Sequence, residues 1–207
     1  MRFFCYFSTM VLGLFLSSSL CAADGPLGID HRLDYDNSGI WDRQVQLNVI
    51  NGLLAVDVAG ALWLGHDTRL GKTFWYSMDA TLAGTVSSQI LKRVFSRKRP
   101  IDSESPNEWF ANSGHQSFPS GEVTVMTAMV TPFILEYRHD YPAVYALELL
   151  PFYDAVARMK VRGHWQTDVL AGFALGTGVS LLAHSRQSPW LVSVLPDGIT
   201  IGVHTRF

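Results

Sequence analysis

Hydrophobic and polar residues follow a helical period over most of the chain after residue 43. Apolar residues three or four positions apart, such as Leu47, Ile50 and Leu54, predict a helix over 44–64. Comparable runs predict four further helices, over about 73–95, 121–137, 143–160 and 164–184. Pro132 and Pro151 lie inside two of these runs, and we expect each to bend or split its helix.

The end of the chain has a different pattern. Apolar and polar residues alternate over 190–195 and again over 199–207, on either side of Pro196-Asp197-Gly198. Two alternating runs around such a turn are typical of a β-hairpin. We therefore expect an all-α bundle of five to six core helices with a short C-terminal β-hairpin.

The first 23 residues resemble a secretory signal peptide. Arg2 gives a positive start, residues 3–16 are mostly apolar, and Cys21-Ala22-Ala23 supplies small residues for cleavage. An uncleaved membrane anchor is the alternative. Cys5 and Cys21, the two cysteines of the sequence, both lie in this segment. The mature chain would then have no disulfide and no thiolate for catalysis or metal binding.

Composition limits the remaining possibilities. The sequence has 207 residues, of which 48% are hydrophobic and 16% charged, and its net charge of −2 argues against a nucleic-acid partner. We expect residues 24–207 to form a single domain. The apolar run 44–64 carries Gln46, Asn51 and Asp57, so we interpret it as a buried core helix rather than a membrane span. These patterns predict a soluble protein or one that contacts a membrane peripherally.

His164 and Asp168 form the first candidate for chemistry. They lie four residues apart, so on a helix they would share one face. Asp168 could then accept the Nδ1 proton of His164 and leave Nε2 as a nucleophile or base. The alternative is a structural histidine that is satisfied by a nearby carboxylate.

A set of cationic and backbone groups suggests an anion site. Ser120 and Gly121 stand where a helix begins, and the N–H groups of a helix N-terminus bind anions. Lys92, Arg99 and Arg158 flank this point in sequence and supply the charges that suit a phosphoryl group. The alternative for Ser120 and Gly121 alone is an ordinary helix cap.

Taken together, these residues resemble the type 2 phosphatidic acid phosphatase superfamily. Three signatures match in order: Lys92 to Pro100 fits K-x6-R-P, Phe118 to Gly121 fits the start of P-S-G-H, and Arg158 to Asp168 fits R-x5-H-x3-D. This superfamily includes bacterial class A acid phosphatases, lipid phosphate phosphatases and vanadium haloperoxidases. The resemblance implies a helical bundle and phosphate hydrolysis through a phosphohistidine, without a metal or other cofactor.

The sequence departs from the superfamily at Glu122, which stands where the second signature has histidine. In the superfamily that histidine gives a proton to the leaving group. Glu122 could do so only while protonated, and an unperturbed glutamate has a pKa of about 4.3. Its alternative role is a carboxylate that stabilises the helix N-terminus. His115 is another candidate donor.

A long loop over 101–118 precedes the second signature. Trp109 and Phe110 in this loop could line an entrance for substrate, or they could only pack against the bundle.

The resemblance implies three functional hypotheses. The first is a periplasmic phosphatase that acts on a phosphomonoester, a lipid phosphate or a lipid pyrophosphate, with His164, Asp168 and Glu122 as catalytic residues. Lys92, Arg99, Ser120, Gly121 and Arg158 would bind the phosphate. The second is a weakly active or inactive protein that binds phosphate or lipid headgroups. The third is a vanadate-dependent peroxidase.

Overall fold

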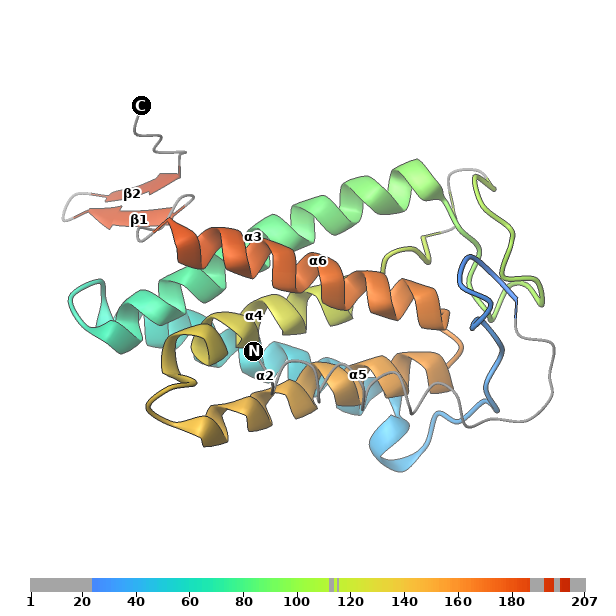
Figure 1. Ribbon diagram of the computed structural model, residues 1–207, viewed down its shortest axis with the longest axis horizontal. Helices are drawn as coiled ribbons and strands as arrows, with labels where there is room; N and C mark the ends of the chain where they lie inside the picture. Colours follow the sequence, from blue (N-terminus) through green and yellow to red (C-terminus); the bar gives the residue numbers. More distant parts are fainter. Residues whose placement is uncertain (1–23, 112–113, 115, 187–191, 196–197, 202–207) are drawn as a thin grey trace.

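The structure is a computed structural model that describes residues 24–111, 114, 116–186, 192–195 and 198–201. Its described core is all-α, as the sequence predicts (Figure 1). The elements, in chain order, are η1 (Gly39–Trp41), α2 (Arg43–Leu64), α3 (Arg69–Phe95), α4 (Gly121–Tyr137), η2 (Pro142–Glu148), α5 (Leu149–Lys160), α6 (Gln166–Ser185), β1 (Val192–Leu195) and β2 (Gly198–Ile201).

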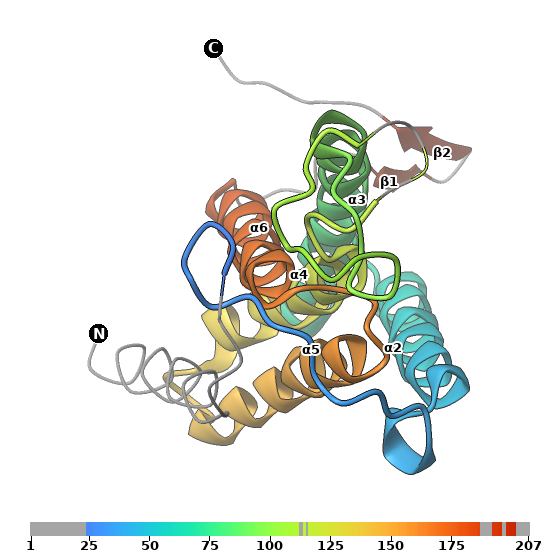
Figure 2. The ribbon, with the colours of Figure 1, turned by 90° about the vertical axis from the view of Figure 1, so that its right-hand side faces the viewer.

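Helix α4 lies at the centre of the bundle. Seen end-on, α2, α3, α5 and α6 surround it (Figure 2), and its most extensive packing is against α3 and α6. Two glycines of α6 allow this close approach. A Cβ atom on Gly172 would lie 2.8 Å from the carbonyl oxygen of Ser120, and one on Gly176 would lie 2.6 Å from that of Thr124. Any larger residue at either position would push α6 away from α4.

The predicted and observed helices differ most at the start of α3 and over residues 143–160. α3 begins at Arg69 instead of near residue 73, because the hydroxyl of Thr68 accepts the Gly71 N–H and caps the helix. The predicted helix over 143–160 consists of the 3₁₀ segment η2 followed by α5. Pro151 falls in the first turn of α5, where the missing N–H of proline breaks no intrahelical bond.

The interpretation of 44–64 as a buried core helix is wrong. By length and composition, α2 and α6 could each cross a membrane. Of the 18-residue apolar stretch in each helix, only 11% is buried in α2, against 39% in α6. Of the polar residues that argued against a span, Gln46 and Asp57 are buried and point inward, whereas Asn51 is exposed. Exposed positions on the second half of α2 include Leu54, Val56 and Trp63.

Strands β1 and β2 pair antiparallel, with Val192 opposite Ile201 and Leu195 opposite Gly198. Residues 196 and 197, which would form the turn, lie outside the described residues, so the hairpin as a whole stays a prediction. The proposed signal segment 1–23 also lies outside them.

Candidate active site

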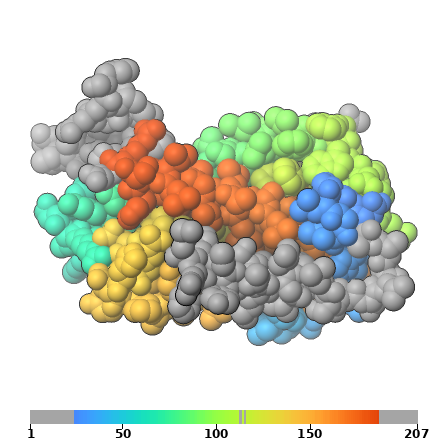
Figure 3. Space-filling model, viewed as in Figure 1, coloured from blue at the N-terminus to red at the C-terminus, as the bar shows by residue number. Residues whose placement is uncertain are grey.

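The candidate residues meet at one end of the bundle, on the right in Figure 1. There, α3 and α5 end while α4 and α6 begin. Lys92 and Arg158 occupy last turns, Glu122 and Asp168 occupy first turns, and His164 lies in the connection between α5 and α6. Residues 24–42, here called the N-terminal segment, and the loop after α3 lie over this end of the molecule, as the space-filling view shows (Figure 3).

His164 is buried and held neutral. Its side chain is 3% exposed, and its Nδ1 has no hydrogen-bond partner among the described residues. Burial, followed by the charges of Lys92, Arg158 and Arg99, lowers the pKa of His164 well below its ordinary value, although Glu122 opposes the shift. At neutral pH the imidazole therefore carries a lone pair on one ring nitrogen.

The predicted helical relation between His164 and Asp168 is wrong in one respect. His164 precedes α6, which begins at Gln166 after the extended N-cap residue Trp165. The Asp168 carboxylate fixes this start because it accepts the Trp165 N–H at 2.9 Å. The two side chains still approach each other, with 3.8 Å between His164 Nδ1 and Asp168 Oδ2. This distance is longer than a hydrogen bond.

Donors surround the Asp168 carboxylate. Besides Trp165 N–H, it accepts from Arg97 Nη1 at 2.6 Å and from Ser117 Oγ at 2.5 Å. Burial raises the pKa of Asp168, against the opposing effects of Arg97, Ser117 and the Trp165 N–H. These partners fix the carboxylate in place, with its Oδ2 3.8 Å from His164 Nδ1.

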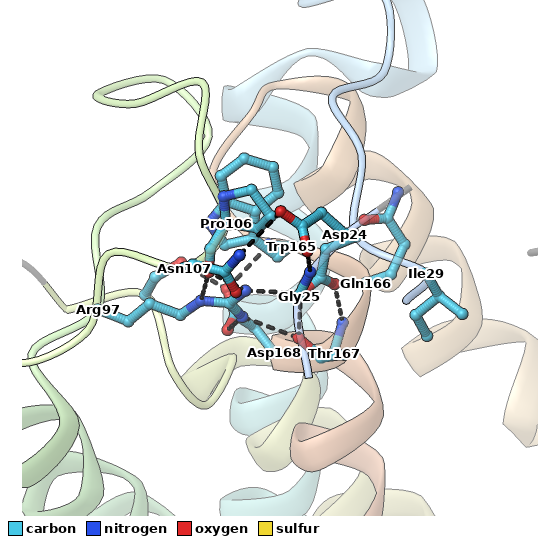
Figure 4. A network of polar contacts seen from close by, with 12 residues as sticks. Asp24, Gly25, Ile29, Arg97, Pro106, Asn107, Trp165, Gln166, Thr167 and Asp168 are labelled. Carbon is cyan, nitrogen blue, oxygen red and sulfur yellow. Dashed lines mark hydrogen bonds and ion pairs between the residues drawn. The ribbon is translucent and has the colours of Figure 1, made fainter. Parts of the chain in front are cut away.

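Arg97 is a residue that sequence reasoning missed. It is fully buried and forms ion pairs of 2.6 Å with both Asp30 and Asp168. Its guanidinium also donates to the carbonyl oxygen of Pro106 and to the Thr167 hydroxyl (Figure 4). Arg97 thus joins the N-terminal segment, the loop after α3 and the start of α6.

The aromatic residues of the long loop add to this network. The Arg97 guanidinium lies 4.3 Å from the centre of the Trp109 ring, and Trp109 packs edge-on against Phe95 and Phe118. Phe110 is 67% exposed. Trp109 therefore packs against the bundle. His115 lies outside the described residues.

The structure brings Lys92 and Arg99 together. Lys92 Nζ donates to the Gln116 carbonyl oxygen at 2.7 Å, and Arg99 Nη2 lies 3.5 Å from the same atom. Burial, with the charges of Arg99 and Arg158, lowers the pKa of Lys92 to about 8, although Asp168 opposes the shift. Lys92 is therefore still mostly cationic at neutral pH.

Arg158 approaches the same region from α5. Its side chain is 5% exposed, and its Nε lies 3.6 Å from Glu122 Oε2. The guanidinium lies against the backbone of Gly163, where a Cβ atom would come within 2.4 Å of Nη2. Glycine directly before His164 thus makes room for the arginine.

The start of α4 differs from the predicted anion site. The Ser120 N–H donates to the Asp168 carbonyl oxygen at 2.9 Å, so it is not available to an anion. The Ser120 hydroxyl does not cap the helix either, and it is buried without a partner in the described part of the chain. Gly121 supplies the first helical N–H of α4, which has no intrahelical acceptor. Its missing side chain matters because a Cβ atom would lie 3.3 Å from Lys92 Cε.

Glu122 pairs with a residue that the sequence analysis did not single out. Arg43, the first residue of α2, donates two hydrogen bonds to its carboxylate, from Nη1 at 2.6 Å and from Nη2 at 2.5 Å. Burial raises the pKa of Glu122, but the Arg43 hydrogen bonds and the charges of Arg158 and Arg43 outweigh it, so the net shift is downward. Glu122 is therefore a carboxylate at neutral pH.

Comparison with known proteins now identifies the family. The family model described as PAP2 superfamily matches residues 74–190, more than half of the chain. The chain belongs to the PAP2 superfamily. All three signatures lie inside the matched range, whereas Asp30 and Arg43 precede it. The comparisons with curated proteins and with solved structures each gave no match.

Membership confirms the resemblance to the type 2 phosphatidic acid phosphatases and sets the coarse activity. Proteins of the PAP2 superfamily are in general phosphatases that act on phosphate esters. At this level the protein is a phosphoric ester hydrolase with a phosphate-ester substrate.

Proposed function

We propose that this protein is a periplasmic, metal-independent phosphatase that uses His164 as its nucleophile. The observation that carries the proposal is the meeting of three cations from separate elements around a buried, neutral histidine. The charges of Lys92, Arg99 and Arg158 all act on His164. Cations of this kind stabilise the negative charge that is spread over a phosphoryl group during transfer.

The proposed reaction has two steps. The Nε2 lone pair of His164 attacks phosphorus, and the bond from phosphorus to the leaving oxygen breaks. Water then attacks the phosphohistidine, the P–N bond breaks, and inorganic phosphate leaves while His164 is restored. Asp168 is the positioning residue, because it is held by Arg97 and Ser117 and lies 3.8 Å from Nδ1. Phosphorylation gives the imidazole a positive charge, which would draw Nδ1–H toward this carboxylate.

The phosphate would be held by Lys92, Arg99 and Arg158, by the Gly121 N–H and by the Ser120 hydroxyl. The hydroxyl is a suitable donor because it is buried and has no partner in the described residues. A bound phosphate oxygen would satisfy it.

Export and membrane contact are further parts of this proposal. The sequence of residues 1–23 supports export to the periplasm, by cleavage or as an anchor. The exposed apolar face of α2 supports contact with a membrane surface. Only 11% of the 18-residue apolar stretch of this helix is buried, so most of its apolar surface lies outside the bundle. A lipid phosphate or lipid pyrophosphate would be a suitable substrate there.

A phosphate-binding protein without turnover is the second candidate. The ionised Glu122 favours it, because the superfamily's proton donor is replaced by a group that holds no proton at neutral pH. Vanadate-dependent peroxidase activity is the third candidate, because the same residues could hold vanadate.

A single experiment separates these candidates. Purified protein is assayed for phosphate release from soluble and lipid phosphates, for peroxidase activity with vanadate and peroxide, and for thermal stabilisation by millimolar vanadate. A phosphatase releases phosphate and is stabilised by vanadate through binding linkage. A binding protein shows the stabilisation alone. Arg158→Ala should lose most of the shift, while Arg93→Ala, an exposed arginine at the end of α3, should keep it. Without any shift or turnover, the proposal fails.

A further inference from the structure

The Glu122 carboxylate is held from two sides by guanidinium groups. Arg43 binds both of its oxygens, at 2.6 and 2.5 Å, and Arg158 Nε lies 3.6 Å from Oε2. Glu122 also stands in the first turn of α4, where the helix dipole favours a negative charge. A proton on one Glu122 oxygen would break one of the two hydrogen bonds from Arg43. This geometry makes Glu122 an acceptor and not a proton donor.

Because Glu122 is a carboxylate without a proton, it restricts which leaving groups can depart readily. When the P–O bond breaks, the leaving oxygen keeps the electron pair and departs as an anion unless an acid gives it a proton. An alkoxide is about as basic as hydroxide, so it is a very poor leaving group without a proton. A phenoxide corresponds to a pKa of about 10. A phosphate leaving group corresponds to a pKa of only about 6.

Arg43 supplies what a phosphate leaving group needs. It is the first residue of α2 and precedes the range that matches the family model. Its side chain is 35% exposed, so it can meet a ligand that enters beside Glu122. Lys92, Arg99 and Arg158 act together on His164, whereas Arg43 reaches the site through Glu122. Arg43 could therefore form an ion pair with a second anionic group next to the transferred phosphate.

We propose that this site prefers phosphoanhydrides, the terminal phosphate of a diphosphate, over alkyl phosphomonoesters. Arg43 would receive the inner, leaving phosphate, and Glu122 would be a positioning residue for Arg43 and Arg158. The inference rests on the proposed function and narrows its substrate class.

The proposed step is balanced without an acid. His164 Nε2 bonds to the terminal phosphorus, and the bond from that phosphorus to the bridging oxygen breaks. The bridging oxygen keeps the electron pair and stays on the inner phosphate, whose negative charge Arg43 accepts. Water then releases inorganic phosphate from His164, as in the ester reaction.

Among the described residues, Asp154 is a rival proton source. It lies one helical turn before Arg158 on α5, its carboxyl is buried, and neither oxygen has a hydrogen-bond partner among the described residues. Burial, with the charge of Glu122, raises its pKa to about 7, against Arg158 and Arg43. The experiment therefore includes Asp154→Asn.

The test compares octyl diphosphate with octyl phosphate, which share the same chain, and adds an aryl phosphate as a general probe of turnover. The wild type should show kcat/KM for octyl diphosphate at least about 100-fold above that for octyl phosphate, since a missing general acid costs about 10²–10⁴-fold. Glu122→His restores a donor, and it should raise turnover of octyl phosphate and narrow the ratio. Arg43→Ala should raise KM for octyl diphosphate more than for the aryl phosphate. Arg93→Ala should change neither the kcat/KM ratio of the two octyl substrates nor the KM for octyl diphosphate.

Three results would overturn the inference. Equal turnover of the two octyl substrates by the wild type would show that a proton donor is present. A selective loss of octyl phosphate turnover in Asp154→Asn would identify that donor as Asp154. A similar KM change for both substrate types in Arg43→Ala would remove Arg43 from the leaving-group site. The proposed function survives all three, and in this experiment it fails if no substrate, including the aryl phosphate, releases phosphate.

Discussion

Replacement of Arg97 by methionine should destabilise the protein by about 3–5 kcal/mol, the usual cost of removing one partner from a buried ion pair. The side chains of Arg97, Asp30 and Asp168 are all 0% exposed, so the substitution leaves two carboxylates without their cation in a dry environment. The two losses share one residue and will not simply add. A shift of about 2–4 °C per kcal/mol is usual for a chain of this size, so Tm should fall by about 6–20 °C.

Lys98 offers a matched control one residue along the chain. It pairs with Glu108 at the surface, where the two side chains are 30% and 38% exposed. Such exposed pairs contribute about 0–1 kcal/mol, so Lys98→Met should lower Tm by only a few degrees. Urea and thermal unfolding of both variants, with intact wild type beside them, measure the contrast. If the two substitutions cost the same within about 1 kcal/mol, the buried network does not hold the site together as argued.

Two further predictions follow from single residues. Burial raises the pKa of the Asp57 carboxyl to about 7, although the Ser77 hydroxyl opposes the shift. Between about pH 4 and about pH 7 the folded state therefore holds a proton that the unfolded state has lost. This contribution to stability, roughly 4 kcal/mol at most, declines as pH rises from about 4 to about 7. Asp57→Asn should remove that part of the pH dependence, so urea unfolding at pH 5 and pH 8 should differ less in the variant; an unchanged difference would contradict the assignment. Gly163→Ala should displace the Arg158 guanidinium and remove much of the stabilisation by vanadate, whereas Gly178→Ala, where nothing lies within 4 Å of the added carbon, should retain it.

Helical periodicity predicted most of the fold. The runs that became α2, α4 and α6 were found within one or two residues, because their apolar residues recur at helical spacing whether or not a neighbour covers them. The start of α3 was missed because it depends on a single capping hydroxyl, that of Thr68. The exposure of α2 was missed because periodicity gives the positions of apolar residues and not which neighbour covers them.

The candidate site was predictable where its residues follow a known spacing. Lys92, Arg158 and His164 come together as the signatures imply. The partners of the carboxylates were not predictable, since Arg43 lies 79 residues before Glu122 and Asp30 lies 67 residues before Arg97. No local pattern marks such pairs. The predicted free N–H of Ser120 failed for the same reason, because its acceptor, the Asp168 carbonyl, belongs to another helix.

The proposed nucleophile can be tested directly by trapping the intermediate. Wild-type protein is mixed with a substrate carrying a labelled transferable phosphate, quenched within a turnover, and analysed for the labelled residue. The account predicts a phosphate that is labile to acid, stable to base and located on His164, with none in a folded His164→Ala variant that also has lost turnover. Label on another residue, or near-normal turnover by His164→Ala, would contradict it.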